Sequence, residues 1–250
     1  RHLGNAVRLN ASVTGLAQTE SGWTVRFTDG AGRQEQGHAA VLYVGTAYRL
    51  PELAIEAAAP IALAEFSKIY YPPVASVVLG FRREDVAHPC CGFGMLIPRV
   101  EGFQILGTLF SSSLFPGRAP EGHHTLTSYL GGAQNPDAAR LDEPKLVDLT
   151  LKDLRTLLGV TGRPTFQQVV HWPKAIPQYE VGYGRYKELM NDIERQAPGF
   201  FLGGHFRDGV SLGDSIVAGL RAAERVGAFL KTAGVGTPAA PPRAALGAMV

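Results

Sequence analysis

The feature that most constrains the fold is a strand, a glycine-rich loop and a helix that follow one another between residues 198 and 226. Residues 200–202 form a short apolar run ended by two glycines, which is typical of a buried parallel strand. The segment HFRDGVSLGD is expected to be a loop. From Ser215 apolar residues recur at helical spacing, and Ser211 or Asp214 can cap the helix. Such a connection favours the binding of a phosphate or an electron-rich carbonyl at the helix N-terminus. An ordinary β-loop-α connection shows the same pattern.

Length and charge limit the classes of protein to which the chain can belong. Its 250 residues allow one or two domains with a sizeable core. A net charge of +2 with 18% charged residues lacks the basic footprint of nucleic-acid-binding proteins, so no nucleic-acid partner is expected. No apolar run approaches the roughly 20 residues of a membrane-spanning helix.

The cysteines and histidines suggest no metal or disulfide chemistry. Cys90 and Cys91 are adjacent and make no disulfide framework, which favours a reducing compartment and a cytoplasmic location. His88, His123 and His124 are interpreted as loop residues, because neither histidine-containing segment supplies four ligands at metal-binding spacing. No metal site is therefore expected.

The N-terminal part of the chain predicts strands. Residues 23–28 alternate apolar and polar side chains, as in a half-buried strand, and the Asp-Gly pair at 29–30 is typical of a hairpin turn. The apolar run 39–47 predicts another core strand. One or two short helices are expected within 48–66, and a proline-delimited strand within 70–81.

The middle of the chain predicts an antiparallel sheet and a helix. The segments FGMLIP (93–98), ILGTLFSSSLFPGRAP (105–120) and LTSYLGG (126–132) are interpreted as three strands of an antiparallel sheet, separated by Gly/Pro/Ser turns and sharing one apolar face. Glu143-Pro144 opens an amphipathic helix that Gly159 ends. A strand over 165–172 and a helix over 186–195 are expected to follow.

Three motifs resemble the protoporphyrinogen oxidase family, within the flavin-dependent amine oxidase and phytoene desaturase superfamily. LGGHFRDGVSLGDSIVAG is similar to the C-terminal flavin-contacting motif of that family. FGMLIP, ILGTLFSSSLFPGRAP and LTSYLGG follow one another at the family's spacing, and HWPKAIPQYEVGY is similar to the segment that returns toward the flavin. The resemblance covers nearly the whole chain, from about Val7 to Val226.

The resemblance implies a mixed α+β and α/β fold that is part of a two-domain, FAD-linked oxidoreductase. Residues 1–55 would supply the β-meander and a core strand of a Rossmann-like FAD domain. Residues 56–190 would form an antiparallel-sheet substrate domain with helices, and 191–232 would return to the FAD domain as strand, loop and helix. The Pro- and Ala-rich residues 233–250 are expected to be a disordered tail.

The resemblance also implies the site residues. Val210, Ser211 and Leu212 match the loop whose backbone lies against the isoalloxazine ring of FAD, and Val13 matches a valine that contacts the adenine end.

On the substrate side, Leu96 and Leu109 match residues that clamp the macrocycle, and Tyr129 matches an aromatic residue that lies against a pyrrole ring. Taken by themselves, these residues are as well explained by core packing. Trp172 and Tyr179 could line the flavin edge or simply pack. Arg118 could bind a propionate, but an anchor for its own loop is the favoured interpretation.

The activity that the resemblance implies is the FAD-dependent oxidation of protoporphyrinogen IX to protoporphyrin IX, in heme and porphyrin biosynthesis, with molecular oxygen as acceptor. The flavin would carry the redox chemistry and the protein would orient the macrocycle, so no catalytic acid–base residue is nominated. The alternatives are a coproporphyrinogen III oxidase of the same family, a carotenoid desaturase, an amine oxidase, and an inactive porphyrin-binding or structural domain.

Two further expectations concern the rest of the protein. The chain begins at Arg1 and has no G-x-G-x-x-G between a strand and a helix, so we expect a C-terminal portion that binds FAD weakly or not at all alone. Family members can attach peripherally to a membrane, here the inner membrane, or form homodimers. The sequence indicates neither property.

Overall fold

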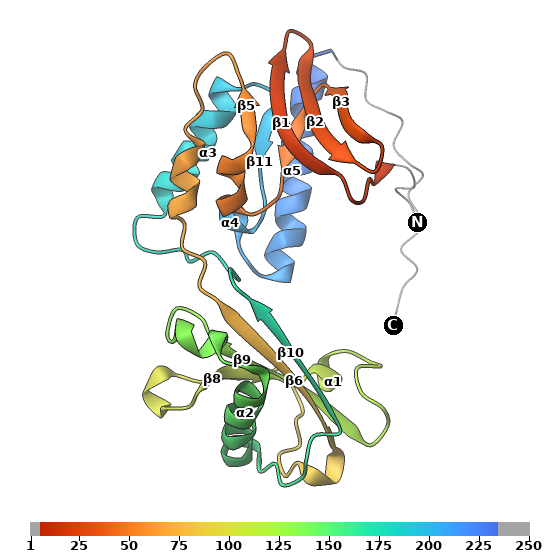
Figure 1. Ribbon diagram of the computed structural model, residues 1–250, viewed down its shortest axis with the longest axis vertical. Coiled ribbons are helices and arrows are strands. Elements are labelled where there is room, and N and C mark those ends of the chain that lie inside the picture. Colours follow the sequence, from red (N-terminus) through yellow and green to blue (C-terminus); the bar gives the residue numbers. More distant parts are fainter. Residues whose placement is uncertain (1–5, 235–250) are drawn as a thin grey trace. The chain divides into compact units, whose positions relative to one another are not determined.

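The computed structural model describes residues 6–234, which form two compact units (Figure 1). One unit, here called the split unit, contains the chain up to Tyr70 and again from Tyr179. The other, here called the central unit, is continuous from Tyr71 to Gln178. The chain therefore crosses between the units at about residues 70 and 179. The resemblance implied crossings near residues 56 and 190.

The split unit contains two sheets. A four-stranded sheet has the order β3-β2-β1-β5, in which β1, β2 and β3 form an antiparallel meander and β5 pairs parallel with β1. The strands β4 and β11 form a separate parallel pair. The strands of this unit are β1 (Ser12–Thr19), β2 (Gly22–Asp29), β3 (Gly32–His38), β4 (Val41–Tyr43), β5 (Ala54–Glu56) and β11 (Phe200–Leu202).

Helices of the split unit surround the parallel pair. The predicted helix over 186–195 is α3, and the helix after the glycine-rich loop is the long α5. The helices are the 3-10 turns η2 (Ala47–Glu52) and η3 (Leu63–Lys68), and α3 (Gly184–Gln196), α4 (His205–Asp208) and α5 (Leu212–Thr232). The parallel pairing of β11 confirms the expectation drawn from its short apolar run.

The core of the split unit is largely aromatic. Trp23 is almost fully buried; its ring lies 5.6 Å from that of Phe200, and its indole N–H donates to the carbonyl of Pro198 at 3.0 Å. Phe206 packs edge-on against Tyr43 and Phe66. These contacts join the β-meander to the strand and helix that follow residue 198, although the two segments are far apart in the sequence.

The central unit is one antiparallel sheet with the strand order β10-β6-β9-β8-β7. The predicted helix after Glu143 is α2, whose N-cap Asp142 accepts from the Lys145 amide and whose C-cap is the left-handed Gly159. The elements are β6 (Val74–Arg82), β7 (Gly94–Leu96), β8 (Ile105–Leu109), β9 (His123–Gly131), β10 (Phe166–Trp172), α1 (Ser111–Leu114), α2 (Glu143–Leu158), and the 3-10 turns η4 (Arg83–Asp85), η5 (Arg99–Glu101) and η6 (Pro136–Arg140).

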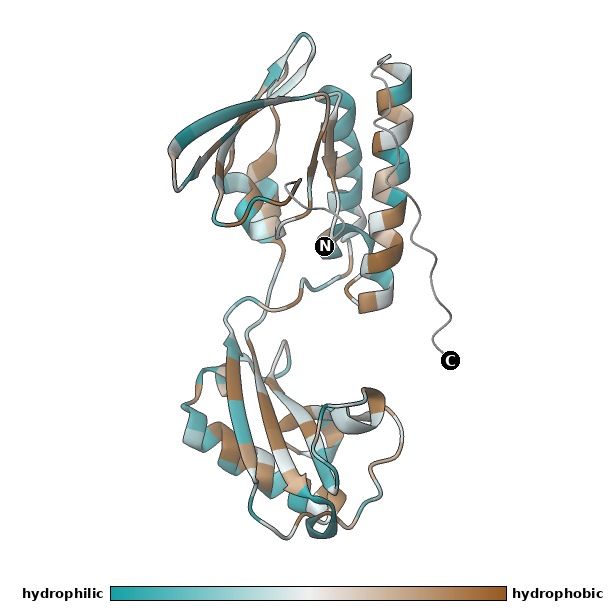
Figure 2. Ribbon diagram, turned by 90° about the vertical axis from the view of Figure 1, so that its right-hand side faces the viewer, coloured by the Kyte–Doolittle hydropathy of each residue, from teal (hydrophilic) through white to brown (hydrophobic). Residues whose placement is uncertain are grey.

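The two faces of this sheet differ in their packing. On one face, Val77, Leu79 and Leu126 are fully buried and belong to the hydrophobic core that also contains Leu146 and Leu154 of α2. Figure 2 shows apolar and polar residues alternating along the long strands of this unit. Because side chains alternate across a strand, the residues between the core positions point to the other face. That second face, here called the open face, lies opposite α2.

The three strands predicted between 93 and 132 are confirmed as β7, β8 and β9, and the serines after Leu109 lie in α1, between β8 and β9. Serine favours turns and helix starts over strand interiors. Three other local predictions were wrong. His123 and His124, interpreted as loop residues, begin β9. Residues 205–208 form the short helix α4, and α5 begins at Leu212 rather than near 215. The strand predicted over 39–47 is shortened to β4.

Two further observations concern the helices and the C-terminal end of the chain. None of the helices in residues 6–234 combines the length and apolarity needed to cross a lipid bilayer. The expected disordered tail lies almost entirely outside the described residues, because the description ends at Gly234.

Candidate functional site

The open face of the central unit brings the three substrate-side candidates together. Gly107 on β8 is the register partner of both Leu96 on β7 and Tyr129 on β9. Leu109 pairs with Gly94 on one side and Thr127 on the other. Register partners point to the same face of a sheet, and so do residues two apart on one strand. Leu96, Leu109 and Tyr129 therefore all lie on the open face.

Gly107 lies between Leu96 and Tyr129 on the open face and has no side chain. A Cβ atom at this position would lie 2.4 Å from the carbonyl oxygen of Met95 and 3.3 Å from Leu96 Cδ2. The missing side chain leaves a shallow place in the sheet between Leu96 and Tyr129. A flat ligand lying across the strands needs such a low, apolar floor.

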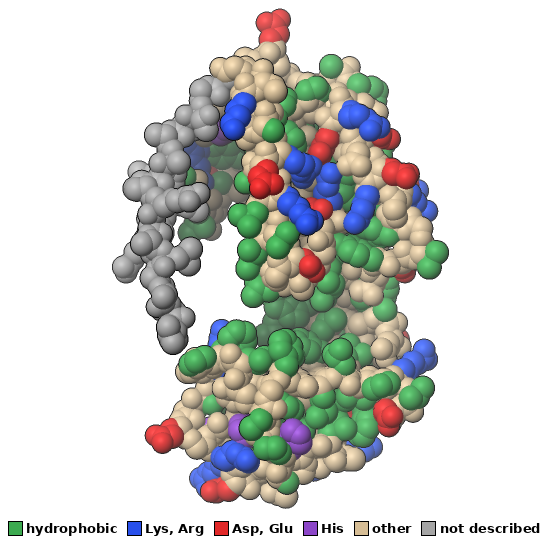
Figure 3. All heavy atoms as spheres, turned by 180° about the vertical axis from the view of Figure 1, so that it is seen from behind, with side chains coloured by type: hydrophobic (Ala, Val, Ile, Leu, Met, Phe, Trp, Pro, Cys, Tyr) green, Lys and Arg blue, Asp and Glu red, His purple; other side chains and the backbone are tan. Residues whose placement is uncertain are grey.

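A cavity of about 770 Å³ opens over part of this face. Leu109 and Tyr129 line it, whereas Leu96 does not and is 89% exposed on the edge strand. In Figure 3 hydrophobic and histidine side chains gather on the exposed surface of the central unit. The lining residues are Val78, Gly80, Leu109, Ser111, Phe115, Arg118, Pro120, His123, His124, Thr125, Thr127, Tyr129, Thr165, Phe166 and Gln168.

The titratable groups around this cavity are mostly neutral. Burial raises the pKa of Tyr129, so its phenol stays protonated at neutral pH. Burial, helped by the nearby Arg83, lowers the pKa of His124, which therefore stays uncharged. Among the described residues that line the cavity there is no aspartate or glutamate, and Arg118 is the single permanently charged one. The cavity is therefore weakly positive.

Val13 lines a second cavity, which belongs to the split unit. This cavity has a volume of about 620 Å³ and is walled by β1, β2 and the segment from β4 to residue 53. Val13 is 45% exposed and precedes a bulge in the pairing of β1 with β2. The lining residues are Val13, Thr14, Leu16, Val25, Val41, Leu42, Tyr43, Val44, Arg49, Glu52 and Leu53.

Val210, Ser211 and Leu212 lie at the start of α5. Ser211 is the N-cap: its hydroxyl accepts from the Asp214 amide at 3.0 Å, and its own amide donates to the Asp214 carboxylate at 3.3 Å. This capping box confirms that both residues predicted as caps act at this end. Leu212 is 76% exposed, and Val210 is also exposed. The loop thus presents apolar side chains beside the positive end of a 21-residue helix.

Two tyrosine hydroxyls hold the loop before α5. The Tyr179 hydroxyl donates to the His205 carbonyl and accepts from the Gly209 amide at 2.9 Å. The Tyr183 hydroxyl donates to the Phe206 carbonyl at 2.5 Å, and the two rings lie 4.4 Å apart. Gly209 has a φ of +114°, and a Cβ atom there would collide with Asp214, so only glycine suits this turn. Tyr179 therefore positions the loop.

Replacing Tyr179 by phenylalanine should loosen this loop without unfolding the protein. Two hydrogen bonds of about 1 kcal/mol each would be lost, so the Gly209 amide should exchange with solvent up to about thirtyfold faster. Hydrogen exchange resolved by residue measures this directly. The matched control is Tyr70→Phe, at an exposed tyrosine of the same unit, which should leave the exchange of Gly209 unchanged. Equal exchange in both variants would contradict the positioning role.

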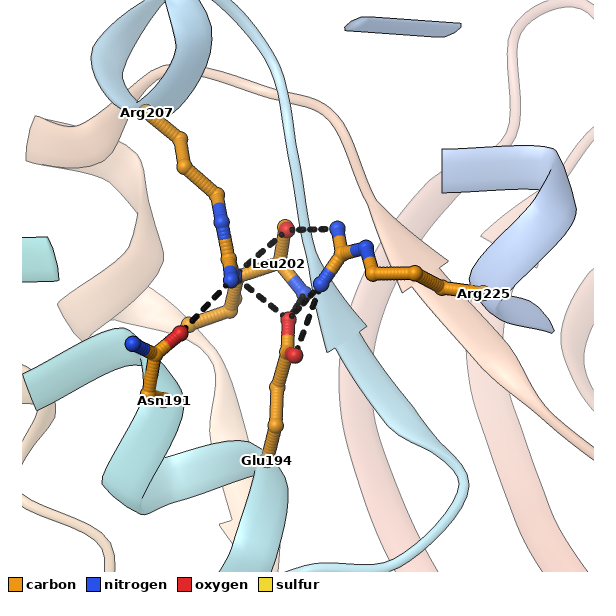
Figure 4. Close-up of polar contacts among 5 residues, drawn as sticks. All are labelled: Asn191, Glu194, Leu202, Arg207 and Arg225. Atoms are coloured by element: carbon orange, nitrogen blue, oxygen red, sulfur yellow. Dashed lines mark hydrogen bonds and ion pairs between the residues drawn. The ribbon is translucent and has the colours of Figure 1, made fainter. Parts of the chain in front are cut away.

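A partly buried ion cluster fixes the strand that leads into the loop (Figure 4). The Glu194 carboxylate on α3 accepts from Arg207 at 2.6 Å and from Arg225 on α5 at 2.7 Å. The Leu202 amide also donates to Glu194, and the Leu202 carbonyl accepts from both arginines. Asn191 accepts from Arg207 at 2.8 Å. One carboxylate thus joins α3, β11, α4 and α5.

Sequence reasoning missed this cluster and the role of Tyr179. Glu194, Arg207 and Arg225 carry no local signal, because their partners are 13 and 31 residues away. Trp172 and Tyr179, both proposed above for the flavin edge or for packing, belong to different units. Trp172 lies on the open face, opposite Val74, and its indole N–H donates to the Ser76 hydroxyl at 3.4 Å. Within residues 6–234 no three His, Cys, Asp or Glu side chains gather as a metal site.

Comparison with known proteins adds independent information. A model of the family described as "Flavin containing amine oxidoreductase" matches residues 1–227. Protoporphyrinogen oxidase 2 of Arabidopsis thaliana is 36% identical over 204 residues, which cover 80% of this chain and 40% of the relative. Coproporphyrinogen III oxidase of Bacillus subtilis is 30% identical over 159 residues, covering 63% and 34%. The chain therefore spans less than half the length of these curated relatives.

A solved structure agrees on the fold. A protein of Exiguobacterium sp. 255-15, assigned provisionally as a protoporphyrinogen oxidase, matches with a TM-score of 0.69 at 20% identity, over 90% of this chain and 47% of that one. This likeness supports the mixed α and β architecture. Because the family model matches residues 1–227, the chain belongs to the flavin containing amine oxidoreductase family.

Proposed function

We propose that this chain is the substrate-binding portion, and part of the flavin-binding portion, of an FAD-dependent oxidase acting on a porphyrinogen. The proposed reaction is oxidation of protoporphyrinogen IX to protoporphyrin IX with molecular oxygen as acceptor. The central unit would hold the macrocycle, and the split unit would hold part of the cofactor. The observation that carries the proposal is the gathering of Leu96, Leu109 and Tyr129 on one open sheet face.

The open face suits a flat and mostly apolar ligand. Leu109 and Tyr129 are half-buried and border a cavity of about 770 Å³, which is within the range of small-molecule sites. An aromatic ring at 129 can lie against a pyrrole ring, and two leucines can limit how far the macrocycle slides. These side chains would also exclude water from the face of the macrocycle that they cover. Their work is orientation rather than chemistry.

The split unit offers groups that fit FAD. The strands β4 and β11 are parallel, and ligands of such sheets bind beyond the carboxyl ends of the strands. Both strands are followed there by glycines, and a Cβ atom at Gly204 would lie 3.3 Å from the Val44 carbonyl oxygen. The cavity lined by Val13 would take the adenine end, and the exposed backbone of residues 210–212 would face the isoalloxazine ring. These residues fit the cofactor in shape and polarity.

The division of chemistry follows from what the side chains can do. Bound FAD supplies the two-electron chemistry of the reaction. The protonated Tyr129 remains an uncharged aromatic surface. The tyrosine and glutamate contacts described above hold the loop before α5 in one conformation, so that the backbone of residues 210–212 is preorganised. We nominate no acid–base residue in the described part of the chain.

The test is a turnover assay on the protein expressed from the complete open reading frame that encodes this chain. With added FAD and protoporphyrinogen IX, porphyrin fluorescence should rise only in the presence of oxygen. An enzyme that binds FAD but gives no fluorescence above the spontaneous rate would overturn the proposal. FAD retained through gel filtration, seen by its absorbance, is the independent check on the cofactor.

A second candidate is oxidation of coproporphyrinogen III. It is favoured by the 30% identity to the Bacillus subtilis enzyme and shares the same cofactor and open face. The same assay distinguishes the two candidates when both porphyrinogens are supplied separately. The substrate with the higher kcat/KM identifies the reaction.

A further inference from the structure

Arg118 stands at one end of the cavity on the open face. It belongs to the loop between α1 and β9, and it lines the cavity together with Phe115 and Pro120. Its guanidinium carbon lies 5.8 Å from the centre of the Phe115 ring. Among the described residues that line the cavity, no carboxylate offsets this charge.

The loop is anchored by the backbone of Arg118 and not by its side chain. The Thr125 hydroxyl on β9 donates to the Arg118 carbonyl at 2.8 Å. The Ser112 hydroxyl accepts from the Thr125 amide at 3.1 Å, which holds α1 against the same strand. No ion pair is formed by the Arg118 guanidinium with the described part of the chain. The favoured sequence interpretation, a loop anchor, therefore applies to the carbonyl and leaves the guanidinium available.

Several other polar groups of the cavity are already engaged. The Ser111 and Thr127 hydroxyls bond to each other at 2.8 Å, and the Thr165 hydroxyl donates to the Gly80 carbonyl at 3.3 Å. His123 Nδ1 must donate to the Glu121 carbonyl at 3.0 Å, because a carbonyl can only accept. Arg118, whose charge no carboxylate offsets among the described residues that line the cavity, is therefore the group best placed to bind an anion.

We propose that Arg118 binds a carboxylate of the ligand that occupies the open face. The proposal rests on the proposed function and names the group that would hold a propionate of the macrocycle. An apolar floor formed by Val78, Leu109 and Tyr129, with one arginine at its end, matches a flat ring that carries an acidic side chain. Arginine suits this task because its planar fork pairs with both oxygens of a carboxylate.

The experiment measures binding by the 250-residue chain itself and does not depend on turnover. Protoporphyrin IX and its dimethyl ester are titrated separately in one detergent-containing buffer, and the porphyrin emission reports binding. The chain should bind the diacid more tightly than the diester. Arg118→Gln should weaken diacid binding by about tenfold and leave diester binding unchanged. Arg118→Lys should fall between, because an ammonium lacks the two-pronged geometry.

The matched control is Arg155→Gln. Arg155 is an exposed arginine near the C-terminal end of α2, which covers the opposite face of the same sheet. This variant should bind both porphyrins as the unchanged chain does. Equal diacid affinity in Arg118→Gln and the unchanged chain would overturn the proposal, and so would failure of both porphyrins to bind. Neither result bears on the turnover assay, so the carboxylate contact and the proposed function can fail separately.

Discussion

Replacing Leu109 by glutamate is expected to lower porphyrinogen turnover by at least about a hundredfold in the complete enzyme, while the melting temperature changes by only a few degrees. Leu109 is half-buried on the open face and borders the cavity. The introduced carboxylate is hydrated while the face is empty. It would lose this hydration when an apolar ring covers the face. Desolvating an unpaired carboxylate costs several kcal/mol, and about 2.7 kcal/mol already corresponds to a hundredfold.

The opposite face provides the matched control. Leu79 on β6 has no exposed surface and packs in the core beneath α2. Leu79→Ala should lower the free energy of unfolding by about 2–5 kcal/mol, as expected for a cavity in a packed core. Leu109→Ala should cost less stability, because part of the side chain is already in solvent. Turnover and thermal unfolding are measured for the unchanged enzyme and the three variants. Together they distinguish a ligand-facing leucine from a core leucine.

Two results would contradict this assignment of Leu109. If Leu109→Glu unfolds the central unit, the residue is part of the core and cannot face a ligand. If the variant is folded and turns over normally, the macrocycle does not lie on this face. The assignment depends on the proposed function, whereas the stability difference between Leu79→Ala and Leu109→Ala depends only on the fold.

Much of the fold was predictable because its signals are local. The Pro at the start of α2 and the Gly at its end are properties of a single helix, and both bounds were predicted correctly. The short apolar run before Gly203 predicted a buried parallel strand, and β11 is one. The run 39–47 was misjudged, since its apolar character continues after β4 has ended at Tyr43. Apolarity alone does not distinguish a strand from the loop that follows it.

The candidate site was only partly predictable, for a physical reason. Period-two alternation shows that a strand has two faces, but cross-strand register decides which residues share a face. Leu96 and Tyr129 share a face because both are register partners of Gly107, and Leu109 shares it because it lies two residues after Gly107 on β8. No single segment of the sequence encodes this register. Polar contacts between residues far apart in the sequence are harder still to predict. Nothing near Glu194 indicates that its partners are Arg207 and Arg225.

Replacing Glu194 by glutamine is expected to lower the free energy of unfolding of the split unit by about 3–5 kcal/mol. The Glu194 side chain is 15% exposed and that of Arg207 is 12% exposed, so both charges are largely removed from water. Breaking a buried ion pair leaves the partner charge uncompensated, and here two guanidinium groups would lose their carboxylate. The Leu202 amide would also lose part of its acceptor, which weakens the end of β11.

The two tryptophans allow the units to be followed separately. Trp23 is buried in the split unit against Phe200, and Trp172 lies in the central unit. In a Trp172→Phe background, the emission of Trp23 reports unfolding of the split unit alone. The control is Asp192→Asn on the same helix, which removes an exposed pair with Arg195 and should cost less than about 1 kcal/mol.

A second substitution tests the cause of the destabilisation. If unpaired, partly buried cations destabilise the Glu194→Gln variant, then adding Arg225→Met should recover part of the loss, because it removes one of them. If the cluster instead acts only by filling space, Arg225→Met should add to the loss. A Glu194→Gln variant as stable as Asp192→Asn would show that the cluster does not hold α3, β11 and α5 together. The loop before α5 would then need another explanation for its fixed conformation.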